Sequence, residues 1–257
     1  MILSKRVALN GVQLDELHDA IVIQRIDPGT PTRNIGTTSL MGGAGQRITG
    51  DHWETLDVTV EYGINLPKRE MEERRQVFEA VTAWALDGGW LTVNWLPNRR
   101  VWVDRAEISN GGDMWEWTNT YTITFRAYCV PFWLDEVPTT ETSPLISNGQ
   151  ISINVAGNVQ SVLDVRFENR SGATINNFKV SAGGNELVLS SLALGGYEAL
   201  QISHGTDGLL RITAGTRSVL SKRTGSDDLY VMPGNNVVRV TADRAGALTV
   251  MSYGRYV

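Results

Sequence analysis

The sequence predicts a mainly β protein of two domains, the first of which contains one α-helix. Short alternating or apolar segments, separated by Gly, Asn, Asp and Pro, run along most of the chain. Only one stretch, residues 67–86, repeats its apolar side chains at helical spacing. All eight tryptophans lie between Trp53 and Trp133, so the two halves of the chain differ in composition.

The domain boundary is predicted near residue 140. The 124 residues after Trp133 contain no tryptophan and are rich in Gly, Asn, Ser, Val and Leu. Between the two compositions, the stretch 137–145 carries two prolines and four hydroxyl residues, which is typical of an extended linker. We therefore predict one domain over residues 1–137, a linker over 138–148 and a second domain over 149–257.

The first domain is predicted to be a β-sandwich or a split-barrel-like sheet structure. Asn10-Gly11 is a strong hairpin-turn signal within residues 7–14. Strands are expected over residues 21–26, 53–62, 90–96, 100–108 and 121–128. In the second of these, Leu56, Val58 and Val60 alternate and so share one face.

The helix is predicted over residues 67–86. Pro67 suits the first turn, where its missing N–H has no helical partner to lose, and Gly88-Gly89 ends the helix. We expect the charged outer face to be solvated and Trp84 to lie in the core. The predicted apolar stripe consists of Met71, Arg74, Val77, Phe78, Val81, Trp84 and Ala85.

Residues 27–45 are predicted to form a long loop. The stretch has too little apolar content to pack by itself, and a loop of this length in a compact domain is usually functional or disordered. Its glycines and prolines are Pro28, Gly29, Pro31, Gly36, Gly42, Gly43 and Gly45.

The second domain is predicted to be a β-sandwich, because many short strands alternate with turn signals and no helical pattern occurs. The expected strands cover residues 151–155, 162–168, 177–181, 186–189, 198–202, 209–213, 237–241 and 247–253.

No catalytic, cofactor or metal site is predicted, and we do not expect an enzyme. His18, His52 and His204 are far apart and show no metal-ligand spacing, and no Gly-x-Ser-x-Gly elbow occurs. Cys129 is the only cysteine, so it excludes an internal disulfide; at the end of a strand it is expected to be a small buried hydrophobe. The net charge of −5 does not indicate a sequence-reading nucleic-acid binder.

No apolar run reaches the roughly 20 residues that cross a bilayer, so membrane insertion is not expected. The first residues are basic but lack an apolar run followed by small residues. We therefore predict no signal peptide and expect the chain to fold in a cytoplasm.

Trp115 and Trp117 follow the turn-like sequence Asn-Gly-Gly-Asp-Met and are predicted to be exposed aromatic contacts.

The order of these features resembles the siphophage distal tail proteins (Dit). In the first half the resemblance rests on Gly-Gly-Ala-Gly-Gln-Arg at 42–47, the helix end at 81–89, the hairpin at 91–103 and Phe-Arg-Ala-Tyr-Cys-Val-Pro-Phe-Trp at 125–133. In the second half, residues 167–175 and 225–236 look like the galectin-like domain of that family. The resemblance covers nearly the whole chain.

The resemblance implies a virion protein of the tail tip, assembled in the cytoplasm of the bacterial host. Such proteins typically form a hexameric ring that joins the tail tube protein to the tail-tip hub and the receptor-binding or fibre proteins. DNA would pass through the channel without specific binding. The resemblance also implies a galectin-like second domain, which here lacks the tryptophan that sugar-binding galectins use for stacking.

We expect the first domain to carry the ring contacts, because a heterologous contact repeated by rotation closes into a ring. The candidate interface residues are Gly36, Met41, Gly42, Gly43 and Arg47. Two alternatives stay open: a carbohydrate-binding adhesin, which would place exposed aromatics on one sandwich face, and a tail-associated hydrolase, which would need paired carboxylates or a metal cleft.

The two halves differ in charge. Residues 1–137 hold 13 Lys and Arg against 19 Asp and Glu, a net charge of −6, whereas residues 138–257 hold 10 against 9, a net charge of +1. Because acidic walls repel DNA, we expect the first domain to line the channel with some of these carboxylates. The alternative is that they lie outside and aid solubility.

Overall fold

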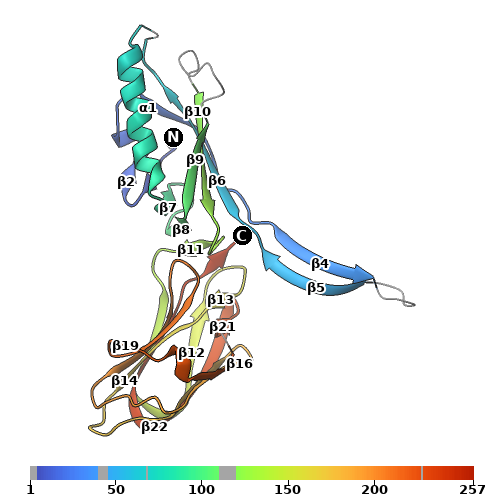
Figure 1. Cartoon of the computed structure of the whole chain (residues 1–257), viewed down its shortest axis with the longest axis vertical. Coiled ribbons are helices and arrows are strands. Elements are labelled where there is room, and N and C mark those ends of the chain that lie inside the picture. The colour runs from blue at the N-terminus through green and yellow to red at the C-terminus, as the bar shows by residue number, and fades with distance from the viewer. Residues whose placement is uncertain (1–4, 40–45, 68, 110–119, 227) are drawn as a thin grey trace. The chain divides into compact units, whose positions relative to one another are not determined.

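The computed structural model describes residues 5–39, 46–67, 69–109, 120–226 and 228–257 (Figure 1). The chain divides into two units, Met1–Trp133 and Leu134–Val257. Both are built mainly of strands, and the described residues contain one α-helix, in the first unit, which confirms the predicted fold class.

Besides a two-stranded sheet formed by residues 33–39 and 46–53, the first unit contains two larger sheets that place short apolar strands next to one another. Within residues 1–132, one has the order β2 (Val12–Gln13), β1 (Val7–Leu9), β7 (Gly89–Val93) and β8 (Arg99–Val103). The other has the order β3 (Ile21–Asp27), β6 (Leu56–Ile64), β10 (Thr120–Ala127) and β9 (Arg105–Ser109). Leu56, Val58 and Val60 of β6 are fully buried, as their alternation predicts. Asn10 and Gly11 both have positive φ, as the predicted two-residue turn between β1 and β2 requires.

Helix α1 (Met71–Leu86) packs against the first unit through the predicted stripe. Val77, Val81 and Ala85 are buried, whereas Trp84 is half-buried. The Trp84 ring lies edge-on to Phe125 at 5.8 Å between centroids, and its Nε1–H donates to the Val12 carbonyl at 3.2 Å. Trp84 therefore contributes to the packing beneath the helix without being fully enclosed.

The start of the helix differs from the prediction. It begins at Met71 rather than at Pro67, because the Glu70 N–H donates to the Pro67 carbonyl in a turn that precedes the helix. Arg74, placed on the apolar stripe by its spacing, is buried and donates from Nη1 to the Leu66 carbonyl at 3.0 Å. The end agrees with the sequence: Gly88 has a φ of +63°, and a Cβ there would lie 2.5 Å from the Val103 carbonyl oxygen.

The predicted loop over residues 27–45 is in part a strand. Strand β4 (Arg33–Ser39) pairs with β5 (Gln46–Trp53), and these two strands form a separate sheet that we call the arm. Figure 1 shows the arm extending away from the other sheets of the first unit. The prediction of an unpaired loop was wrong because the hydrogen-bonding partner of β4 comes from residues that carried no strong strand signal.

The second unit is organised around two long antiparallel strands, β12 (Thr139–Val155) and β22 (Gly234–Ser252). The first half of β22 pairs with β15 and its second half with β14, so one curled sheet encloses the core. Among the described residues, 25 buried side chains, including Phe167 and Phe178, form that core. The remaining strands are β11 (Trp133–Asp135, at the unit boundary), β13 (Ser161–Val162), β14 (Asp164–Asn169), β15 (Phe178–Ala182), β16 (Asn185–Leu189), β17 (Ala199–His204), β18 (Leu210–Ala214), β19 (Arg217–Ser218), β20 (Arg223–Gly225), β21 (Tyr230–Val231) and β23 (Arg255–Tyr256).

Three further expectations are corrected. Residues 138–148 are extended as predicted, but residues from Thr139 onward belong to β12 and pair with β22, so they are not a free linker. The strands predicted over 237–241 and 247–253 are parts of one strand, β22. Cys129 is exposed rather than buried, because it follows the end of β10, where its N–H donates to the Asp104 carboxylate at 3.2 Å.

Candidate functional site

The arm is the candidate interaction surface of the first unit. Apart from Gly36 and Trp53, which are partly buried, its described side chains are exposed. Within the described residues, no third strand pairs with β4 or β5, so both outer edges keep backbone groups available for pairing. A lone two-stranded ribbon is marginally stable in water, so packing against another surface would stabilise it.

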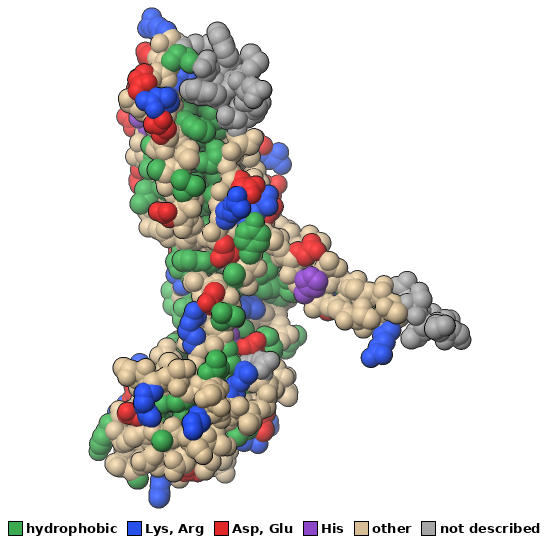
Figure 2. Space-filling view, in the orientation of Figure 1, with side chains coloured by type: hydrophobic (Ala, Val, Ile, Leu, Met, Phe, Trp, Pro, Cys, Tyr) green, Lys and Arg blue, Asp and Glu red, His purple; other side chains and the backbone are tan. Residues whose placement is uncertain are grey.

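One face of the arm carries apolar side chains in an otherwise polar ribbon. Ile35 and Thr37 are two residues apart and share a face, and Thr37 lies directly opposite Ile48, so all three point the same way. Ile35 is 47% exposed and Ile48 is 62% exposed. The side of the arm visible in Figure 2 is mostly neutral, whereas charged side chains gather over α1.

An exposed ion pair joins the two strands near the base of the arm. Arg33 Nε donates to Asp51 Oδ1 at 2.8 Å, and the guanidinium lies 5.8 Å from the centre of the Trp53 ring. The hydrogen bond from Arg33 holds the pKa of Asp51 below its ordinary value. The two charges cancel, so the isoleucines lie in a locally neutral surface.

The base of the arm is fastened to the first unit. The Trp53 ring lies edge-on to Phe132 at 5.7 Å, and Trp133 Nε1 donates to the Pro28 carbonyl at 3.2 Å. Gly29 has a φ of +65°, and a Cβ at this position would lie 2.0 Å from the Asp57 carbonyl oxygen. Only glycine fits where the chain enters the arm.

A polar hollow of about 550 Å³ opens beside this base. It could receive a segment of a neighbouring molecule, since its walls present both donors and acceptors. The lining residues are Thr32, His52, Trp53, Glu54, Thr55, Asp57, Arg126 and Tyr128.

Two of the five predicted interface residues lie on the arm. Gly36 lies in β4 and Arg47 in β5, whereas Met41, Gly42 and Gly43 lie outside the described residues, as do Trp115 and Trp117. Sequence reasoning missed Ile35 and Ile48. The sequence marks each of them only as a single isoleucine in a polar segment, and the two segments pair with one another in the structure.

The second unit contains a buried charged cluster centred on His204, whose side chain is 6% exposed. Nδ1 of His204 lies 2.9 Å from Asp164 Oδ1, and Nε2 lies 3.0 Å from Asp228 Oδ1. The Tyr230 hydroxyl donates to the other oxygen of Asp228 at 2.9 Å. Burial lowers the pKa of His204, but hydrogen bonds to the two carboxylates and their charges outweigh burial, so the pKa lies above its ordinary value.

Among the described residues, no group of three or more His, Cys, Asp or Glu side chains is placed to hold a metal ion. No described helix is long and apolar enough to span a bilayer.

No protein-family model matches the sequence, and no curated protein matches it at the sequence level. The solved structures do match. The Dit protein of phage SPP1 superposes with a TM-score of 0.65 over 96% of this chain and 98% of that chain, at 12% sequence identity. The chain has the fold of a Dit protein.

The predicted resemblance to Dit is thus confirmed as a likeness of fold. Two structures of the phage P2 baseplate, in its activated conformation with Ca and with Sr, also match. Their TM-scores are 0.42 and 0.41, at 10% and 9% identity, over 96% of this chain and 97% of each of theirs. The structural match to the SPP1 Dit protein covers both units of this chain, the first unit with its arm and the β-rich second unit.

Proposed function

We propose that this chain is a structural ring protein at the tip of a phage tail, without a catalytic role. The observation that carries the proposal is the Dit fold over nearly the whole chain. The SPP1 protein is described as a paradigm of the hub of the adsorption apparatus in phages that infect Gram-positive bacteria. A similar place in a virion would put this chain between the tail tube and the receptor-binding apparatus.

The arm supplies the contact that such a ring needs. No described strand pairs with its outer edges, and Ile35 and Ile48 are exposed, so packing against another molecule would bury them. A second copy is the simplest partner, since one arm laid on one neighbour and repeated by rotation closes a ring. We propose six copies, as in the family the sequence resembles.

The charge of the first half supports a place around the DNA channel. Residues 1–137 carry the net charge of −6, and the residues after them carry a net charge of +1. A basic wall would bind phosphates and hold the DNA, whereas an acidic wall repels it. We propose that the first unit lines the channel, and that the second unit, with a galectin-like sandwich, contacts the tail-tip hub and receptor-binding or fibre proteins.

Native mass spectrometry of the full chain tests the proposal. A ring of six copies of 28.3 kDa has a mass of about 170 kDa. A monomer that persists at concentrations of tens of micromolar, with no closed oligomer, would contradict a self-assembling ring.

A further inference from the structure

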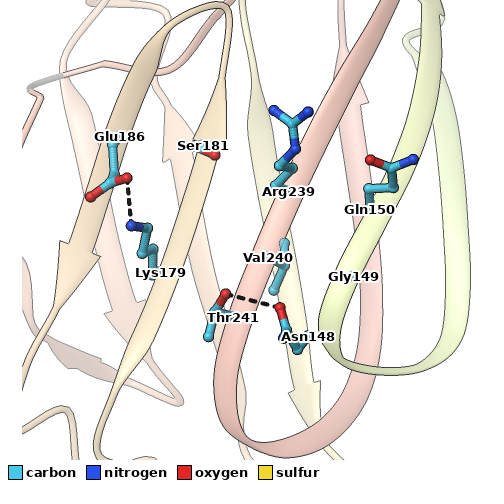
Figure 3. Close-up of a pocket in the computed structure, with 9 residues that line it drawn as sticks. All are labelled: Asn148, Gly149, Gln150, Lys179, Ser181, Glu186, Arg239, Val240 and Thr241. Atoms are coloured by element: carbon cyan, nitrogen blue, oxygen red, sulfur yellow. Dashed lines mark hydrogen bonds and ion pairs between the residues drawn. The ribbon is translucent and has the colours of Figure 1, made fainter.

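The second unit has a polar sheet face that is not needed for the proposed ring. Its side chains form two ordered rows, which could together contact one ligand. Four neighbouring strands place Gln150, Arg239, Ser181 and Glu186 directly opposite one another, in a straight row across β12, β22, β15 and β16. Two residues along the strands, Asn148, Thr241 and Lys179 form a second row. Because residues two apart share a face, all seven side chains point the same way. We call this surface the shelf (Figure 3).

The shelf is hollowed rather than flat. It forms an open depression of about 460 Å³, which leaves a bound ligand partly exposed to solvent. The buried Val240 lies beneath it. The wall is therefore rigid sheet, and its polar groups are held at the fixed spacing of the strands.

The charges of the shelf leave one cation without a counter-ion. Lys179 Nζ lies 2.6 Å from Glu186 Oε2, and Thr241 Oγ1 donates to Asn148 Oδ1 at 3.4 Å. The guanidinium of Arg239 lies between Gln150 and Ser181 in Figure 3 and has no hydrogen-bond or ion-pair partner among the described residues. A guanidinium presents five N–H donors in a plane that matches a carboxylate or a phosphate.

We propose that the shelf binds an acidic saccharide. Its carboxylate or phosphate would accept hydrogen bonds from Arg239, and its hydroxyl groups would donate to Glu186 and exchange hydrogen bonds with Gln150 and Asn148. None of the described residues that line the shelf is a tryptophan, tyrosine or phenylalanine, so a neutral sugar would lack a ring to stack on there. The ligand is therefore selected by charge and hydrogen bonds. This inference goes beyond the ring and does not depend on it.

The test is calorimetric titration of the full chain with tri-galacturonate, glucose 6-phosphate and neutral maltotriose. We expect at least one anionic probe to bind and maltotriose not to bind. Arg239→Gln should weaken that binding at least tenfold and leave the oligomeric state unchanged. The matched control is Arg211→Gln, which removes an exposed arginine already paired with Asp207 and should leave binding unchanged.

Three outcomes would overturn the proposal. The first is that neither anionic probe binds at millimolar concentration, and the second is that maltotriose binds as well as they do. The third is that a hexa-glutamate peptide binds more tightly than both anionic probes and loses its binding in Arg239→Gln. That result would assign the shelf to an acidic protein segment instead.

Discussion

At the scale of single residues, Trp84 shows how a helix of mixed composition is held in place. Its ring packs edge-on against Phe125 of the neighbouring sheet, and its N–H reaches the backbone of β2. One side chain thus joins the helix to both sheets of the first unit. The sequence predicted a core role from the helical spacing, and the structure adds the hydrogen bond, which no spacing shows.

Trp84→Ala should lower the free energy of unfolding of the first unit by about 3 kcal/mol, since it removes a packed aromatic ring. Urea unfolding followed by tryptophan fluorescence measures this unit alone, because every tryptophan lies between residues 53 and 133. Trp95→Ala is the matched control: that side chain is 50% exposed, and its loss should cost less than about 1 kcal/mol. Equal effects of the two substitutions would show that the helix face is misassigned.

His204 makes the stability of the second unit depend on pH. Its folded pKa is raised, so its contribution is fully present below the unfolded pKa of about 6.5 and is lost as pH rises through the folded value. At pH 6, His204→Gln should be less stable than the unchanged chain by about 1.5–3 kcal/mol, because charge-assisted hydrogen bonds are lost. At pH 9 the difference should be smaller. Urea unfolding followed by far-ultraviolet circular dichroism at both pH values checks this, and a difference that grows with pH would refute it.

The residues of the candidate site were only partly predictable. Gly36 and Arg47 lie in the arm as expected, but Ile35 and Ile48 were not singled out. A lone isoleucine in a Gly- and Thr-rich segment carries no periodicity, so its exposure follows only from the pairing of β4 with β5. His204 shows the same limit, because its carboxylate partners are 40 and 24 residues away in the sequence.

At the scale of elements, the two glycine turn signals were read correctly, whereas the helix start at Pro67 and the long-range pairing were not. The hairpin at Asn10-Gly11 and the helix stop at Gly88-Gly89 follow from backbone preferences of two residues each. The segment taken for a linker is instead the first part of β12, which pairs with β22, a strand that begins almost a hundred residues later. Prolines and hydroxyl residues favour extended chain, and sequence alone does not say whether such a chain is paired.

The arm is the element on which assembly should depend. Replacing Ile35 and Ile48 together by lysine puts two charges on the exposed apolar face and should shift the full chain from oligomer to monomer in light scattering, without unfolding it. The matched control replaces Asn34 and Thr38, on the opposite face of the arm, by lysine and should keep most of the oligomer. If both pairs behave alike, the contact is not made by the isoleucine face.

At the scale of the whole molecule, the division into two units suggests that assembly depends on the first unit alone. The first unit holds the arm and the acidic excess, and the second is a sandwich with its own core. Residues 1–137 expressed alone should therefore form the same oligomer as the full chain. A monomeric fragment under conditions where the full chain is a ring would show that the second unit is needed for assembly.

Electron cryomicroscopy of the assembled full chain tests the central claim most directly. We expect a closed ring of six copies, in which each arm lies on the neighbouring copy and the first unit lines a channel with more Asp and Glu than Lys and Arg. A closed ring lined by the second unit, or by mainly basic side chains, would contradict the channel assignment. Open filaments, or particles in which the arms touch no neighbour, would contradict the account as a whole.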